Sequence, residues 1–155
     1  MNQPDCQIID AIAEDLDAIL ALQKLAYLSE AAIYGPDIPP LRQTLDEIRD
    51  EARDGRILKL VVGGRIVGSV RGRERGGSCL VGKLIVHPDF QRRGHGAALL
   101  RAIEAAFPQC ARFELFTGDR SASNLRLYEN AGYKVFQRKK IADHLTFIYL
   151  EKHTR

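Results

Sequence analysis

Tryptophan is absent from this 155-residue sequence, and cysteine is scarce, with only Cys6, Cys79 and Cys110. An odd number of scattered cysteines lacks the paired spacings that a disulfide framework or a structural zinc site requires. We therefore expect no disulfide framework and no metal site. The three cysteines are interpreted as small buried side chains of a protein from a reducing compartment.

Long apolar segments are also missing. No run approaches the roughly 20 residues that a membrane-spanning helix requires. Residues 1–5 have neither the basic start nor the apolar centre of a signal peptide. These absences predict a cytoplasmic protein with no membrane partner.

The sequence has no strong excess of charge of either sign. Its formal net charge is +3, and its basic residues form no long tract, so no nucleic-acid partner is predicted. With 45% hydrophobic and 28% charged residues, the chain is long enough to bury one core. Because no repeat or low-complexity linker divides it, residues 1–155 are expected to form a single domain.

Glycine, proline and capping residues that interrupt the apolar pattern indicate where the helices and strands begin and end. Gly63-Gly64 between two apolar runs predicts a hairpin, Thr44 and Glu47 fit a capping box, and Pro39-Pro40 cannot continue the preceding helix. We predict strands at 6–12, 57–62, 65–73, 79–86, 113–117, 133–141 and 145–151, and helices at 15–34, 44–52, 94–107 and 122–131. The order β-α-α-β-β-β-α-β-α-β-β, with hairpins in the middle and at the end, indicates an α/β (α+β) domain with a mixed central sheet flanked by helices.

The most informative stretch is residues 84–100. It is typical of a buried strand, a proline stop at Pro88, and a basic glycine loop that opens an amphipathic helix. Backbone N–H groups at a helix start have no partner, and the helix dipole there favours an anion. Gly94 and Gly96 let the backbone approach closely, and Arg92 and Arg93 add positive charge. The stretch therefore predicts a diphosphate site.

The glycine loop has two further interpretations as a nucleotide-binding motif. A P-loop requires Gly-Lys-Ser/Thr, which is not found near a strand end. A dinucleotide fingerprint requires a third glycine, where this chain has Leu99, although Glu114 lies near the place of the fingerprint's acid. A nicotinamide-dependent dehydrogenase and a plain tight turn therefore stay open as alternatives.

Two motifs resemble those of the GCN5-related N-acetyltransferase (GNAT) family. Gln91-Arg92-Arg93-Gly94-His95-Gly96 is similar to its pyrophosphate-binding motif, Gln/Arg-x-x-Gly-x-Gly/Ala, and residues 121–133 are similar to its later Asn/Tyr motif. The resemblance implies the acyl-CoA N-acyltransferase fold and acetyl-CoA as cosubstrate. The cofactor-binding residues that it implies are Leu84, Ile85, Val86, Gln91, Arg92, Arg93, Gly94, His95, Gly96, Ala97 and Asn124. Ser121 is the alternative to Asn124.

The resemblance also implies that Tyr128 donates a proton to the departing thiolate, which a phenol of pKa about 10 can do. A backbone N–H near Ile85 and Val86 would hold the thioester carbonyl. The strand 79–86 contains no acid. The general base is therefore sought among other groups, namely Glu30, Glu114, His87 and water.

The helix 15–34 supplies the acceptor hypothesis. The face that carries Leu16 and Ile19 early in the helix carries Tyr27, Glu30 and Tyr34 later. We hypothesise that these three residues bind the acceptor and that Glu30 attracts its cationic amine and acts in catalysis. The alternative is an amphipathic helix whose last turns are simply exposed.

Together these features predict an acetyl-CoA-dependent N-acetyltransferase. A primary amine, from a small molecule or a protein, would attack acetyl-CoA directly in a ternary complex. The expected assembly is a monomer or a homodimer. A non-catalytic acyl-CoA-binding sensor is the alternative of another class.

Overall fold

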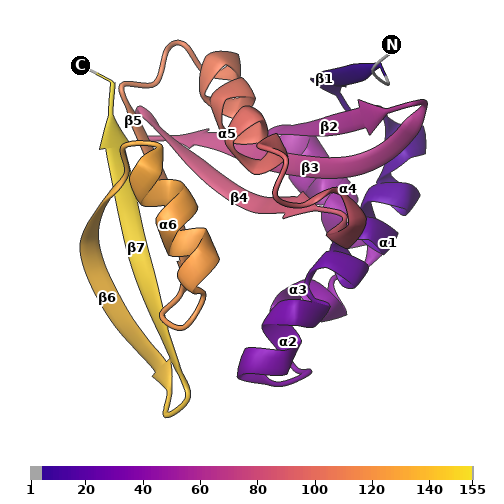
Figure 1. Ribbon diagram of the computed structural model, residues 1–155. Helices are drawn as coiled ribbons and strands as arrows, with labels where there is room; N and C mark the ends of the chain where they lie inside the picture. Colours follow the sequence, from indigo (N-terminus) through magenta and orange to yellow (C-terminus); the bar gives the residue numbers. More distant parts are fainter. Residues whose placement is uncertain (1–4, 155) are drawn as a thin grey trace.

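A seven-stranded sheet in the order β1-β2-β3-β4-β5-β7-β6 carries helices on both faces (Figure 1). The structure, a computed structural model, describes residues 5–154. The strands are β1 (Cys6–Asp10), β2 (Arg56–Val62), β3 (Arg65–Arg75), β4 (Ser78–Val86), β5 (Arg112–Gly118), β6 (Lys134–Ala142) and β7 (Leu145–His153). The helices are η1 (Ala13–Asp15), α1 (Leu16–Ala26), α2 (Leu28–Tyr34), α3 (Pro39–Arg42), α4 (Leu45–Asp54), η2 (Pro88–Phe90), α5 (His95–Ala106) and α6 (Ala122–Asn130).

The predicted α/β fold with a mixed sheet is confirmed. All neighbouring strands pair antiparallel except β4 and β5, which pair parallel. A doubly wound dinucleotide-binding fold needs a mostly parallel sheet, so the dehydrogenase alternative is wrong. Within residues 5–154, no helix is long and apolar enough to cross a bilayer.

The prediction of one helix over 15–34 is wrong, because the helix is interrupted at Tyr27 between α1 and α2. The Ser29 hydroxyl donates to the carbonyl of Ala26 over 3.2 Å. Such a side-chain bond competes with the backbone ladder and bends helices. The connector beyond α2 also contains the short α3, in which proline at the first helical position starts the helix, since that position needs no N–H partner.

Two apolar layers cover the two faces of the sheet. On one face, Leu99, Leu100 and Ile103 of α5 are fully buried, and α5 lies so close to β3 that a Cβ at Gly72 would stand 2.9 Å from Phe107. On the other face, Ile19 of α1 and Ile48 of α4 form a second buried cluster. The sheet is therefore held between α5 and α6 on one side and α1 and α4 on the other.

Strands β4 and β5 part soon after they begin. Their parallel pairing joins only residues 78–80 to residues 112–114, and Figure 1 shows the two strands diverging beyond it. Opposite β3, β4 carries one extra residue at Lys83 and Leu84, and Lys83 has a φ of 49°. A β-bulge of this kind bends its strand. Beyond Leu80, the backbone of β4 therefore has no strand partner on its β5 side.

Candidate active site

The glycine loop folds as the predicted anion site requires. Gly94 is the N-cap of α5 in the left-handed conformation, with φ 81°, and Arg92 also has a positive φ of 63°. The first backbone bond into the helix runs from Ala98 N to Gly94 O, 3.1 Å. No side chain caps this end, and its first turn contains no acidic residue. The amides at the start of α5 therefore keep their affinity for an anion.

Neighbouring side chains brace this loop. Gln91 Nε2 donates to the carbonyl of Val86 over 3.1 Å, and the Arg93 guanidinium lies 5.2 Å from the centroid of the Phe90 ring. A Cβ at Gly96 would stand 3.2 Å from Leu127 Cδ2 of α6. The loop is thus packed between the end of β4 and α6, and a large side chain at Gly96 has no free space.

Tyr128 lies on α6 with its side chain buried. Among the residues described, nothing forms a hydrogen bond with its hydroxyl, which is nevertheless not closed off from solvent. Burial, followed by the nearby Tyr27 and Glu30, raises the pKa of Tyr128 well above its ordinary value. The phenol therefore keeps its proton at neutral pH and is available to an incoming group.

Glu30 is tied to the start of α6. Its carboxylate accepts hydrogen bonds from Ser121 Oγ at 2.8 Å and from Asn124 Nδ2 at 3.2 Å. Asn124 Nδ2 also lies 3.3 Å from Thr117 Oγ1 at the end of β5. The structure thus brings together Glu30 and both residues that the sequence offers as cofactor contacts.

Tyr34 performs a packing role at the same junction. Its hydroxyl lies 2.9 Å from Ser121 Oγ and accepts a hydrogen bond from Arg120 N at 2.9 Å. It also lies directly against Gly118, where a Cβ would collide with the phenol ring. Tyr34 is 7% exposed, so it joins α2 to the β5–α6 connection.

A cleft of about 320 Å³ opens on the α4 face of the sheet where β4 and β5 part. Its lining residues are Glu51, Arg71, Gly72, Arg73, Leu80, Val81, Gly82, Lys83, Glu114, Leu115, Phe116 and Tyr149. None of Tyr27, Glu30 and Tyr34 lines it, so their role as acceptor-binding residues stays a prediction. A larger hollow of about 440 Å³ lies between the start of α1 and the end of α4, away from the parted strands, and it contains none of the predicted site residues.

A buried arginine organises one wall of this cleft. Arg71 Nη1 donates to Gln43 Oε1 at 2.9 Å and to Glu51 Oε2 at 2.5 Å, and its Nη2 donates to Gln23. Lys83 Nζ lies 3.8 Å from Glu51 Oε1. Burial lowers the pKa of both Arg71 and Lys83, and the carboxylate of Glu51 opposes that shift.

Sequence reasoning missed this cluster, although one signal was present. Arg71 is the one charged residue within the stretch 66–72, and a charged residue at an inward position of a strand is rarely left without a partner. Tyr27 connects the cluster to Glu30: burial raises the pKa of Tyr27 to about 12, with Arg71 opposing the shift and Glu30 and Glu51 reinforcing it.

The candidate bases occupy different places. Glu114 lines the cleft and forms an ion pair with Arg112 at 2.9 Å. His87 lies beyond the end of β4, where its Nε2 is 3.3 Å from an Arg65 nitrogen, and does not line the cleft. Of these two candidates, Glu114 is the one that an acceptor in the cleft would meet.

Comparison with known proteins adds three findings. A family model described as an acetyltransferase (GNAT) domain matches residues 53–135, more than half of the chain. Over 128 residues the chain is 30% identical to the UPF0157 protein YqkA of Bacillus subtilis, covering 82% of this chain and 37% of that protein. Over 96 residues it is 38% identical to the mycothiol acetyltransferase of Nocardiopsis dassonvillei, covering 60% of this chain and 29% of that protein. The chain thus spans about a third of the length of these curated relatives.

Solved structures agree with the fold. The ribosomal-protein-S18-alanine N-acetyltransferase of Escherichia coli superposes with a TM-score of 0.81 at 16% identity, over 97% of this chain and 94% of that one. The PaiA N-acetyltransferase of Thermoplasma acidophilum, in complex with coenzyme A, gives 0.79 at 14% identity, over 96% and 99%. At these identities the similarity establishes the fold.

Proposed function

The chain belongs to the GNAT acetyltransferase family, and from that membership we propose that it transfers the acetyl group of acetyl-CoA to a primary amine by direct attack in a ternary complex. Membership confirms the family that the two motifs predicted, and N-acetyltransferase is the enzyme class to which both motifs point. Membership of the family does not identify the acceptor amine of this chain.

One observation carries the proposal: only residues 87–94 separate the uncapped start of α5 from the unpaired edge of β4. The first offers N–H groups and the charges of Arg92 and Arg93 to a diphosphate. The second offers backbone groups of Leu84, Ile85 and Val86 to the amide-bearing arm of the same molecule. These residues fit coenzyme A, which would bring a thioester that an amine can attack.

Tyr128 is the proposed proton donor. Its raised pKa keeps the phenol protonated at neutral pH. A thiol titrates near 8.5, so complete proton transfer from this phenol is uphill before coenzyme A binds. A hydrogen bond from the phenol would stabilise the departing thiolate, and the proton would follow as the charge on sulfur develops.

The amine must lose a proton before or during attack. Glu30 is proposed to attract the cationic amine and to act in catalysis, and its position beside Tyr27 and Tyr128 supports that role. Glu114 in the cleft is the competing base. Relatives named as a ribosomal-protein-S18-alanine N-acetyltransferase and a mycothiol acetyltransferase support both protein and small-molecule acceptors here.

The test is release of coenzyme A thiol from acetyl-CoA across a panel of amines, combined with calorimetry of acetyl-CoA binding. Micromolar to millimolar binding with thiol release on at least one amine is expected. Binding without release on every amine would instead favour the sensor, which the absence of a carboxylate within β4 makes conceivable. Undetectable binding to folded protein would refute both. A cytoplasmic location and a monomeric or homodimeric state stay predictions.

A further inference from the structure

The cleft where β4 and β5 part has an excess of positive charge. Arg71, Arg73 and Lys83 contribute three cations from β3 and β4. Two carboxylates oppose them, Glu51 from α4 and Glu114 from β5, and Glu114 is already neutralised by Arg112 outside the lining. The excess of cations favours an anion in this space.

Two of these cations, Arg71 and Lys83, have hydrogen-bond donors that no acceptor within residues 5–154 satisfies. Arg71 is 6% exposed, and its Nε is the buried side-chain nitrogen or oxygen that has no hydrogen-bond partner within residues 5–154. A buried donor left unsatisfied is costly, and such a group calls for a missing partner. Lys83, with its side chain 26% exposed, stands 3.8 Å from Glu51, beyond hydrogen-bond distance. A carboxylate at this wall would satisfy both groups.

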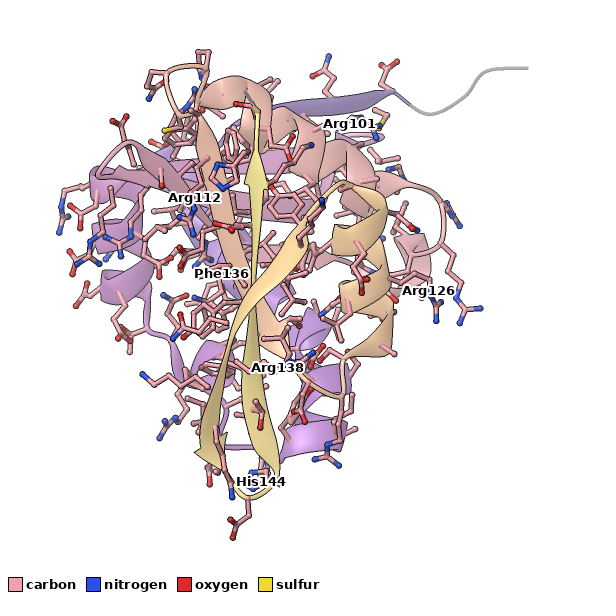
Figure 2. The ribbon with its side chains drawn as sticks, turned by 90° about the vertical axis from the view of Figure 1, so that its left-hand side faces the viewer. Arg101, Arg112, Arg126, Phe136, Arg138 and His144 are labelled. Atoms are coloured by element: carbon pink, nitrogen blue, oxygen red, sulfur yellow. The ribbon has the colours of Figure 1, made fainter. Side chains whose placement is uncertain are left out.

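The facing wall is aromatic. Phe116 is 50% exposed and lies 4.7 Å from the ring of Phe147 and 5.4 Å from that of Tyr149, measured between centroids. Phe136 extends this surface, 6.2 Å from Tyr149, and stacks with Arg112 on the side of the sheet away from Arg126 (Figure 2). Exposed aromatic rings beside a cationic wall match a ligand with an apolar part and a charged part.

We propose that the acceptor is a small primary amine that bears a carboxylate and an apolar side group, the chemical class of the apolar α-amino acids. The carboxylate accepts hydrogen bonds from Lys83 and Arg71 Nε, and the apolar group packs on Phe116 and Tyr149. This inference rests on the proposed function, because it assigns the second substrate of the same reaction.

The experiment compares amino acids with acceptors in which the carboxylate is replaced by a neutral carboxamide or is missing. Phenylalanine is assayed against phenylalaninamide and phenethylamine, and leucine against leucinamide, by release of coenzyme A thiol. We expect kcat/KM for the carboxylates to exceed that for the carboxamides by about ten- to hundredfold, the range of a hydrogen bond to a charged group. The amine of a carboxamide is less basic and more often neutral, so any bias of the assay runs against the proposal.

Two variants that each remove one positive charge test whether Lys83 is the residue that binds the carboxylate. Lys83→Gln should raise the KM for phenylalanine about tenfold or more and leave the KM for phenylalaninamide and for acetyl-CoA unchanged. Arg138→Gln removes a positive charge from the exposed strand β6, outside the cleft, and should change neither. Equal losses on both acceptors in Lys83→Gln would show a structural defect and overturn the assignment of the carboxylate to Lys83.

Failure of this inference is distinguishable from failure of the proposed function. If amines without a carboxylate react as well as those with one, the inference is overturned and the acetyltransferase stands. If no amine in the panel reacts, the inference is tested by the thermal unfolding temperature of the protein–coenzyme A complex with an added acetylated product. Stabilisation by N-acetylphenylalanine and not by its carboxamide supports the inference, whereas equal shifts or no shift overturn it. Absence of acetyl-CoA binding would refute the function and this inference together.

Discussion

The glycine loop at the start of α5 and the cleft between β4 and β5 differ in the groups that they offer to a ligand. Beyond the end of β4, the proposed anion site consists mainly of backbone, namely left-handed Gly94 and the uncapped start of α5. At the cleft, the site consists of side chains brought together from α4, β3, β4, β5 and β7. A backbone site depends on local conformation and on the absence of side chains, whereas a side-chain site depends on charge and on partners. The two should therefore respond to different substitutions.

The largest expected effect belongs to the backbone site. Gly96→Glu introduces bulk against Leu127 and a negative charge at the start of α5, and we expect acetyl-CoA binding measured by calorimetry to fall by more than about a hundredfold. Gly96→Ala is the matched control, because its Cβ needs only a small shift of a flexible side chain, and it should retain binding. Retained affinity in Gly96→Glu would refute the loop assignment.

The next effect concerns Tyr128 of α6, the proposed proton donor. Tyr128→Phe should lower kcat by about a hundredfold or more, as expected for loss of a positioned proton donor, with little change in KM for acetyl-CoA. Tyr133→Phe removes a phenol hydroxyl that donates to Glu104, and it should retain kcat. Steady-state kinetics of the two variants decides, and a wild-type rate in Tyr128→Phe ends the role as proton donor.

Glu30→Gln tests whether the carboxylate beside α6 attracts the acceptor. The amide oxygen of glutamine can still accept from Asn124 and its NH2 group can donate to the Ser121 hydroxyl oxygen, so the junction is preserved while the charge is lost. We expect the acceptor KM to rise about tenfold through loss of a charge-assisted hydrogen bond. The exposed Glu129→Gln on α6 serves as the control. Unchanged KM and kcat in Glu30→Gln would remove the hypothesis.

The smallest effect is on stability and its pH dependence. Burial raises the pKa of Glu51, but the charges of Arg71 and Lys83 and the hydrogen bonds from Gln43 and Arg71 outweigh it, so the net shift is downward. A lowered folded-state pKa contributes stability above the ordinary value of 4.5, and that contribution is lost as the pH falls through the folded-state pKa. Glu51→Gln should therefore lower the free energy of unfolding at pH 7 by about 1 kcal/mol, a value reduced for solvent screening.

Urea unfolding of Glu51→Gln and wild type from pH 7 down to pH 3 checks this sign. The gap between the two proteins should narrow as the pH falls below about 4.5, because the unfolded chain then takes up a proton at Glu51 that the folded protein still excludes. A gap that stays constant over this range would show that the carboxylate of Glu51 is not what Arg71 and Lys83 stabilise.

The sequence predicted what depends on local rules. The hairpin at Gly63-Gly64 formed, both glycines having positive φ, and the capping box of Thr44 and Glu47 is present at the start of α4. The loop at Gly94 could be located because its conformation is set by its own residues. Each of these features involves residues within a few positions of one another.

The cleft could not be predicted in the same way. Glu51 and Phe116 are far apart in the sequence and become neighbours only through sheet order and helix packing. The break at Tyr27 was missed although it is local, because the helical spacing of Leu16 and Ile19 continues to Glu30 and Tyr34 and gives no sign of the interruption beside Ser29. The resemblance to a known family agreed with the order of elements read from the residue pattern, but it did not supply the partners of Arg71.

The extra residue at the bulge of β4 exchanges the two faces of that strand. Before it, Cys79 and Val81 point to the α5 core, whereas after it Leu84 and Val86 do. Odd positions face α5 on one side of the bulge and even positions on the other, which leaves Lys83 free to turn toward α4. If the same residues alternated without this bulge, Lys83 would face the α5 core, whereas Leu84 and Val86 would face α4, so the extra residue is what places the lysine in the cleft.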